Sequence, residues 1–368
     1  MLRSILLASA ALAISPAAAQ SFDSAAVSGL GVRNIGSATM SGRIAAVAGR
    51  QEKDGKVTLL IGSASGGVWK SEDGGTTFKP VFDKQPVKSI GAVALDPTDK
   101  DVMWVGTGES WTRNSVSVGN GVYKSTDGGE TWSLNRGLFD HPHRTQWQPG
   151  GGGLCLHTIL PDPSNQDRMW IAISTGGVYR TEDGGENWEA RNKGIRAPYM
   201  PPDQQYPEWG QCVHKVVAHA SNPNRMFLQH HWGVYRSDNA GDSWDDIGKS
   251  LPSDFGFAME MDPNDANTVY IIPIESDEFR CTPEGKLRVF RTKDSGDSWQ
   301  ALTGGLPQED ALETILRDNM DADANSPTGL YFGTRSGKVF GSSNGGDSWT
   351  LVKDGLPPIT CVKTATVN

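Results

Sequence analysis

The sequence is poor in positive charge. Its 368 residues include 34 Lys and Arg against 43 Asp and Glu, which gives a formal net charge of −9. An acidic chain has no surplus of cations to neutralise phosphate groups, so nucleic-acid binding is excluded as the basis of its function. We therefore expect no nucleic acid among its partners.

Long apolar runs are also scarce. After the first 20 residues, no stretch approaches the roughly 20 apolar residues that a membrane helix needs. Residues 1–20 carry a positive charge at Arg3, continue apolar to Ile14 and end on a run of alanines, which is the pattern of a secretory signal peptide cleaved after Ala19. We expect a bacterial-type secreted or periplasmic protein with no membrane span in the mature chain.

Residues that break regular structure are abundant. The chain has 44 Gly and 21 Pro, well above the average share of roughly 12% for the two together. This composition favours many short strands joined by tight turns over long helices. Twelve Trp residues supply ample apolar surface for a core, which excludes a disordered chain.

A nine-residue motif recurs six times, at steps of 50 to 56 residues. A fixed period of this size is typical of repeat architectures in which each repeat is one supersecondary unit. The six copies are KSEDGGTTF (70–78), KSTDGGETW (124–132), RTEDGGENW (180–188), RSDNAGDSW (236–244), RTKDSGDSW (291–299) and GSSNGGDSW (341–349).

The residue types of the motif are those of a turn. In the first copy, Ser71 and Asp73 carry short oxygen-bearing side chains that can bond the backbone of their own turn. Gly75 can adopt a positive φ without steric cost, and Phe78 can bury a large apolar face between neighbouring units. The other copies keep these types at the same four positions, so we expect the motifs to be structural.

Three β-rich runs precede each motif, and the aromatic residue opens a fourth strand. In the first repeat the runs are RIAAVAG, VTLLIGSA and GVWKS, and in the sixth they are ETILRD, GLYFGTR and KVFGS. Four antiparallel strands repeated around an axis form the blades of a β-propeller. The pattern therefore predicts an all-β propeller of four-stranded blades.

The motifs resemble the Asp-box, or bacterial neuraminidase (BNR), repeat S-x-D-x-G-x-x-W. Residues 32–132 resemble large exported proteins labelled as glycosyl-hydrolase or sortilin-like propellers, and the chain from about residue 137 resembles compact sialidase-like Asp-box proteins. The resemblance implies a propeller fold. Asp boxes occur in sialidases, xyloglucanases, sortilin-type receptors and assembly factors alike, so the resemblance does not imply one activity.

The six boxes predict six complete blades within a single domain, residues 20–368. The segment 356–367 looks like a further first strand, and 29–36 looks like a last strand that precedes the first blade. Pairing of the two would make a partial seventh blade and close the ring, which removes exposed sheet edges. The alternative is a six-bladed ring to which the terminal strands are added.

Strand order separates the boxes from the ligand site. The box turns join the third and fourth strands at one face, whereas the loops between second and third strands and between blades lie at the other, here called the mouth face. Function usually resides on loops held by a rigid scaffold, and these loops mix aromatic and charged residues. The predicted ligand-binding residues are Trp111, Arg113, His143, Trp147, His157, His214, His231, Arg280 and Arg335.

Two adjacent inner strands begin with a Cys-x-His pair, at 155–157 and 212–214, and Cys361 resembles their counterpart. Aligning these strands places Glu313 at the position of the two histidines. Thiol and imidazole ligands suit zinc. Disulfides form in the oxidising compartments to which proteins are exported, so a Cys155–Cys212 disulfide is the other option. The spacing is that of the repeat, however, and small cysteines are common in buried strands. We therefore predict neither a metal nor another cofactor, and leave the pairing of the four cysteines, including Cys281, open.

Two catalytic signatures are missing. Sialidases carry an F-R-I-P segment, but here Arg43-Ile44 is followed by Ala45. Xyloglucanase-like propellers carry T-D-I-G-G with a catalytic Asp, but the matching stretch 63–67 reads SASGG and places Ala64 at that position. Most glycosidases need two carboxyl groups beside the scissile bond. The remaining candidates on the mouth face are Glu109, Glu275 and Asp277.

These observations support two hypotheses. The first is a non-catalytic, monomeric, exported propeller that binds a glycan or a protein partner through the mouth-face loops. The alternative is a glycoside hydrolase, sialidase-like or xyloglucanase-like, that uses mouth-face carboxylates.

Overall fold

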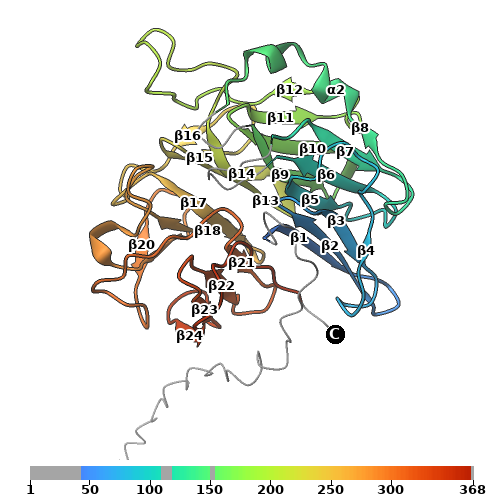
Figure 1. Cartoon of the computed structure of the whole chain (residues 1–368). Helices are drawn as coiled ribbons and strands as arrows, with labels where there is room; N and C mark the ends of the chain where they lie inside the picture. Colours follow the sequence, from blue (N-terminus) through green and yellow to red (C-terminus); the bar gives the residue numbers. More distant parts are fainter. Residues whose placement is uncertain (1–42, 109–117, 150–153, 366–368) are drawn as a thin grey trace, which may run out of the picture.

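Six four-stranded antiparallel sheets, each following the order of the chain, form a six-bladed β-propeller (Figure 1). The structure is a computed structural model and describes residues 43–108, 118–149 and 154–365. The predicted all-β class and the six complete blades are confirmed. Helix in the described chain is limited to α2 (Arg136–Phe139) and two short 3-10 turns, η1 (Pro142–Gln146) and η2 (Pro283–Gly285).

The strands of each blade run from the central axis outwards. Blades 1 and 2 contain β1 (Ile44–Gln51), β2 (Val57–Ser63), β3 (Gly67–Ser71), β4 (Lys79–Pro80), β5 (Ile90–Leu95), β6 (Met103–Thr107), β7 (Val122–Ser125) and β8 (Ser133–Leu134). Blades 3 and 4 contain β9 (Cys155–Asp162), β10 (Asn165–Ser174), β11 (Gly177–Thr181), β12 (Glu189–Ala190), β13 (Val213–His219), β14 (Asn222–His230), β15 (Val234–Ser237) and β16 (Asp245–Asp246). Blades 5 and 6 contain β17 (Gly256–Asp262), β18 (Asp265–Pro273), β19 (Val289–Thr292), β20 (Gln300–Leu302), β21 (Met320–Ala322), β22 (Leu330–Gly333), β23 (Val339–Ser342) and β24 (Thr350–Lys353).

Each box forms the turn that its residues predict. In blade 1, Ser71 Oγ accepts a hydrogen bond from Gly75 N at 2.9 Å, and Asp73 Oδ1 accepts one from Thr77 N at 2.8 Å. The hydrogen bonds from Thr77 lower the pKa of Asp73 to about 2, so its carboxylate is ionised and committed to the turn. The boxes therefore have a structural role, as predicted from their residues.

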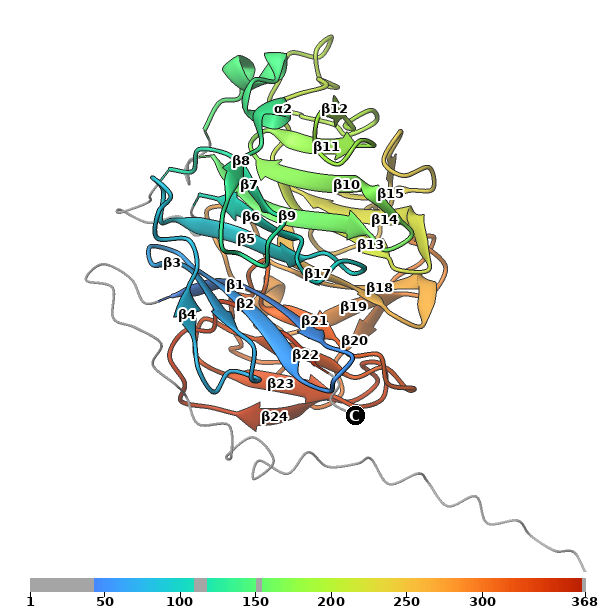
Figure 2. The ribbon, with the colours of Figure 1, turned by 90° about the vertical axis from the view of Figure 1, so that its right-hand side faces the viewer.

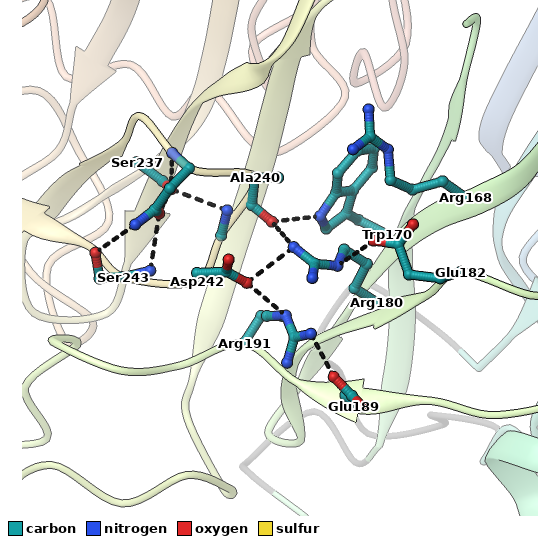
Figure 3. A network of polar contacts seen from close by, with 12 residues as sticks. Arg168, Trp170, Arg180, Glu182, Glu189, Arg191, Ser237, Ala240, Asp242 and Ser243 are labelled. Atoms are coloured by element: carbon teal, nitrogen blue, oxygen red, sulfur yellow. Dashed lines mark hydrogen bonds and ion pairs between the residues drawn. The ribbon is translucent and has the colours of Figure 1, made fainter. Parts of the chain in front are cut away.

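The boxes also join neighbouring blades. Arg180, the first residue of the third box, donates to Ala240 O of the fourth box at 2.9 Å and pairs with Asp242 at 2.9 Å (Figure 3). Trp170 Nε1 donates to the same carbonyl at 2.8 Å. Box residues at the same two positions make the same contact between the other blades, through Lys70 and Gly128, Lys124 and Gly184, Arg236 and Ser295, and Arg291 and Gly345.

A segment without regular structure lies between blade 6 and blade 1, which are neighbours in the ring (Figure 2). Residues 356–365 include Ile359, whose N donates to Thr334 O at 3.1 Å, and Val362, whose N donates to Asp318 O at 2.7 Å. Thr360 Oγ1 reaches Ile44 O of blade 1 at 2.5 Å. The predicted closing strand is wrong within the described residues, because these isolated bonds form no ladder, and its predicted partner at 29–36 lies outside them.

The first strand of blade 6 is also shifted from its predicted position at 313–318. β21 begins only at Met320, because the backbone before it bonds to loops instead of a neighbouring strand. Thr282 N donates to Glu313 O, and Arg335 N donates to Thr314 O, both at 3.0 Å. In the described part of the chain, no helix is long and apolar enough to cross a membrane.

Candidate functional site

The antiparallel order of the blades brings three chain segments together at the mouth face. Cys212 immediately precedes β13, His231 immediately follows β14, and Phe255 immediately precedes β17. His231 N donates to Cys212 O at 3.0 Å, which fixes the two residues opposite each other across blade 4. Loops and strand ends of blades 4 and 5 therefore build one site.

The centre of this site is a group of one thiol and two imidazoles. Cys212 Sγ lies 3.7 Å from His214 Nε2 and 3.7 Å from His231 Nδ1. The three possible ligand atoms all lie within 4.8 Å of one another. We call Cys212, His214 and His231 the thiol–imidazole group.

The second nitrogen of each imidazole has its own partner. His214 Nδ1 lies 2.7 Å from Gly256 O, and since a carbonyl oxygen only accepts, Nδ1 carries the proton. His231 Nε2 lies 3.5 Å from Asp277 Oδ2, which favours a proton on Nε2. In both neutral rings, the nitrogen that faces Cys212 therefore carries a lone pair, and this lone pair is directed at the Cys212 thiol.

Burial keeps the group uncharged in the structure. It lowers the pKa of His214 well below its usual value and lowers that of His231 despite the nearby Asp277 carboxylate. Burial also raises the pKa of Cys212, although Arg317 and Arg280 act in the opposite direction. All three side chains are consequently neutral at pH 7.

An aromatic floor with two cations lies beside the group. Phe257 stacks on the His214 ring with centroids 4.3 Å apart. The guanidinium groups of Arg317 and Arg280 lie 4.9 Å and 5.5 Å from the centroid of the Phe257 ring. A negatively charged or strongly polar ligand could be bound here by the two arginines.

The wall of the site offers flat aromatic surface to solvent. Trp232 packs on His231 with centroids 4.1 Å apart and on Tyr199 at 5.0 Å. Farther along blade 3, Trp209 packs on His143 at 5.1 Å. Tyr199 is 53% exposed and Trp209 is 37% exposed, so both present apolar faces that another molecule can cover.

The predicted ligand residues of blade 3 differ in accessibility. His143 is half-buried, with Nδ1 3.3 Å from the Tyr179 hydroxyl. Trp147 is buried and donates from Nε1 to the same hydroxyl at 2.9 Å, so it supports the loop from below. His157 is buried too, with Nε2 2.9 Å from Val213 O and Nδ1 2.9 Å from Thr158 Oγ1.

Blades 5 and 6 supply the remaining predicted residues. Glu275, Asp277 and Arg335 are exposed, and Arg280 is half-buried. Trp111, Arg113 and Glu109 lie outside the described residues. Glu313 does not join the histidines with which it aligns, because its carboxylate accepts from Ser336 and from Lys338 Nζ at 2.7 Å.

None of the four cysteines is in a disulfide in the structure, so the Cys155–Cys212 disulfide does not form. Cys155 is buried at the start of β9, and Cys361 lies in the C-terminal segment, where burial raises its pKa to about 12. The list of ligand residues predicted from the sequence lacks Cys212, Trp232, Tyr199 and Arg317, although the Cys-x-His pair at 212–214 has ligand types that suit zinc. The adjacent His230-His231-Trp232 run was the available signal, but only the fold shows that it faces Cys212.

The channel below the mouth is a cavity of about 470 Å³ lined by the inner strands of the blades and by the C-terminal segment. Lys215 Nζ pairs with Asp318 at 2.8 Å, and Lys363 Nζ pairs with Asp321 at 2.7 Å. Glu260 lies 3.9 Å from both lysines. These charges tie the C-terminal segment to blades 4, 5 and 6.

Proteins similar in sequence are xyloglucanases, although no family model matches the chain. A xyloglucanase of Hypocrea jecorina is 25% identical over 305 residues, which cover 70% of this chain and 32% of that protein. An oligoxyloglucan-reducing end-specific xyloglucanase of Emericella nidulans is 27% identical over 138 residues, which cover 35% of this chain and 15% of that protein. The chain thus spans at most about a third of these relatives.

Solved structures share the fold. The GH74 xyloglucanase from Xanthomonas campestris superposes with a TM-score of 0.60 at 16% identity, over 84% of this chain and 45% of that one. A YCF48 structure with a bound D1 peptide gives 0.54 at 15% identity, over 84% and 81%. The chain therefore shares the β-propeller fold of both structures. The curated relatives belong to the class that our alternative hypothesis names, the glycoside hydrolases.

Proposed function

We propose that the protein is an exported glycoside hydrolase that acts on a xyloglucan-type polysaccharide at its mouth face. The observation that carries this proposal is the match to a xyloglucanase over 305 residues, 70% of the chain. A match of that length is longer than four repeats, so it does not rest on a single box.

The chemistry of the mouth face supports the proposal. Exposed Tyr199 and Trp209 provide flat apolar surfaces against which the C–H faces of sugar rings can pack. Glycoside hydrolysis generally needs a pair of carboxyl groups, and the exposed Glu275 and Asp277 occupy the same loop of blade 5. We assign these two as the acid and base candidates.

One observation favours a second candidate, glycan binding without hydrolysis. Ala64 occupies the turn in which xyloglucanase-like propellers carry a catalytic Asp. It is fully buried, and its N donates to Arg43 O at 3.0 Å. A methyl group there can neither give nor take a proton, so hydrolysis would need carboxylates from elsewhere.

The two candidates separate when binding and turnover are measured on the same protein. The mature chain is incubated with xyloglucan and its oligosaccharides, with product release followed by mass spectrometry and binding by calorimetry. Hydrolysis predicts a loss of at least about 100-fold in kcat/KM for Glu275→Gln or Asp277→Asn, with Glu278→Gln from the same loop as the matched control. Binding without products supports the second candidate, and absence of both contradicts both.

A further inference from the structure

We propose that Cys212, His214 and His231 bind a zinc ion, as a three-ligand site that opens toward the mouth face. This inference does not depend on the glycan, since it rests on the thiol–imidazole group alone. Zinc favours thiolate and imidazole ligands, and three protein ligands with one remaining position form its open type of site.

The distances match tetrahedral zinc. Bond lengths of roughly 2.3 Å to sulfur and 2.0–2.1 Å to nitrogen place the sulfur and nitrogen ligands about 3.6 Å apart. Cys212 Sγ lies 3.7 Å from both ring nitrogens, and no two of the three atoms are more than 4.8 Å apart. The two sulfur–nitrogen distances are thus already those of a zinc site, and the two ring nitrogens lie within 4.8 Å of each other, against about 3.4 Å in tetrahedral zinc.

The orientation of the rings is already that of metal ligands. A ligating histidine usually gives its other N–H to a carbonyl or carboxylate, which fixes the ring and its tautomer. His214 has Gly256 O in this place at 2.7 Å, and His231 has Asp277 Oδ2 at 3.5 Å. The lone pairs on the other two nitrogens consequently point to Cys212.

The three ligand side chains are held in place by their neighbours, and an ion can reach them from the mouth face. Cys212 and His231 are held opposite each other by the bond from His231 N to Cys212 O, and Phe257 packs on the His214 ring. Cys212 and His231 are only half-buried, so the site is reachable from the mouth face. The soft sulfur ligand and the absence of oxygen among the three ligands disfavour Ca²⁺ and Mg²⁺.

The repeat supplies a matched comparison within the same chain. Cys155 and His157 occupy the same strand positions in blade 3, but both ring nitrogens of His157 are engaged, with Val213 O and Thr158 Oγ1. Ser174 pairs with Cys155 across the strands, where blade 4 has His231 opposite Cys212. The blade 3 pair therefore has one thiol and no available imidazole.

Metal titration of the untagged mature protein tests the proposal. The protein is stripped with EDTA, and Zn²⁺ is added in competition with a chromophoric chelator. Co²⁺ serves as a spectroscopic probe, because a thiolate ligand gives a charge-transfer band. We expect one ion per chain and a thiolate–Co²⁺ band, with Cys155→Ala and Cys281→Ala binding like the wild type.

Cys212→Ala should weaken Zn²⁺ binding by at least about 100-fold and abolish the thiolate–Co²⁺ band. His231→Ala removes a half-buried ligand and provides a second variant if Cys212→Ala does not fold, which circular dichroism reports. Wild-type protein that binds no Zn²⁺, or retention of both metals by either variant, overturns the proposal. These readouts need no glycan, so failure here and failure to hydrolyse xyloglucan are distinguishable.

Discussion

The two Cys-x-His pairs are alike in sequence and different in structure. Both stand at the start of an inner strand, in adjacent blades, with a buried histidine. In blade 3 the ring of His157 is used entirely for internal hydrogen bonds. In blade 4, Nδ1 of the His214 ring hydrogen-bonds to Gly256 O, and Nε2 faces Cys212.

The cause of the difference lies outside the pairs. Blade 4 adds His231 at the end of β14, where blade 3 has Ser174, whose hydroxyl donates to Val213 O at 2.7 Å. Aromatic residues then enclose the blade 4 pair, with Phe255 packing on both His214 and His231. A repeated motif thus acquires a chemical role only where its neighbours on other strands complete it.

The largest expected effect on stability comes from a substitution in the third box, which belongs to blade 3. Gly185 has φ +100°, and a Cβ there would lie 2.6 Å from Asn135 Nδ2 and 3.2 Å from Trp104 Cη2. Gly185→Val should lower the free energy of unfolding by about 3 kcal/mol or more, because strain and crowding add. Urea unfolding measures the change.

The control for this variant is Gly74→Val in the first box. Gly74 has φ +68° with no atom within 4 Å of a built Cβ, so it isolates the backbone strain, about 1–2 kcal/mol. Equal losses in the two variants would show that contact between blades 2 and 3 contributes nothing. Folded Gly185→Val protein should still bind Zn²⁺.

The next largest expected effect is a difference in unfolding free energy between alanine variants of the histidines in the two blades. His157→Ala leaves a cavity in a fully enclosed place and removes two hydrogen bonds, so we expect a loss of about 2–4 kcal/mol. His231→Ala removes a ring that is 18% exposed, with one hydrogen-bonded partner at the loop surface, and should cost about 1 kcal/mol. Denaturant unfolding with EDTA present gives both values, and a larger loss for His231 would reverse the roles assigned here.

Zinc should stabilise the protein through blade 4 alone. An ion that binds only the folded state at 100 times its Kd contributes about 2.7 kcal/mol. Thermal unfolding with Zn²⁺ should therefore shift to higher Tm in the wild type and in Cys155→Ala, but not in Cys212→Ala. A shift that survives in Cys212→Ala would place the ion elsewhere.

A pH-dependent effect concerns Lys215, the residue after His214 in blade 4. Lys215 belongs to the channel charges, among which burial raises the pKa of Glu260 from 4.5 to about 7 against the opposing pull of Lys363 and Lys215. The folded state therefore binds this proton more tightly, and the contribution to stability is full below pH 4.5 and lost as pH rises through 7.

Glu260→Gln should remove this part of the pH dependence. The difference in unfolding free energy between wild type and variant, measured with EDTA from pH 5 to pH 8, should move in favour of the variant as pH rises. A difference that stays constant over this range would mean that Glu260 is ionised throughout, held by its two lysines.

The sequence predicted the blades well because each blade is encoded locally. Turn residues, alternating apolar runs and a fixed period occur within one repeat, so the positions of five of the six first strands follow from pattern alone. The first strand of blade 6 was predicted to begin seven residues too early, in the ETILRD run, because the bonds of that run go to other loops and to the C-terminal segment.

One overlooked signal bears on the blade count. In five boxes the first residue is Lys or Arg and donates to the next box, whereas the sixth box begins with Gly341. The sixth box therefore lacks the side chain that would make this contact with blade 1, and the missing cation marks the last of the six repeats.

The candidate site was harder to predict than the fold. His214 and His231 were named, but Cys212 was set aside as a small buried residue, because its repeat partner Cys155 made the pattern look structural. Contacts among β13, β14 and the blade 5 loop depend on how blades pack, and no local pattern encodes them.

The most direct test of the central claim is anomalous diffraction at the zinc absorption edge from crystals of the mature protein grown with Zn²⁺. We predict one strong peak per chain, bonded to Cys212 Sγ, His214 Nε2 and His231 Nδ1. A peak at other residues only, or no peak while this group is well ordered, would contradict the assignment of a metal site to the mouth face.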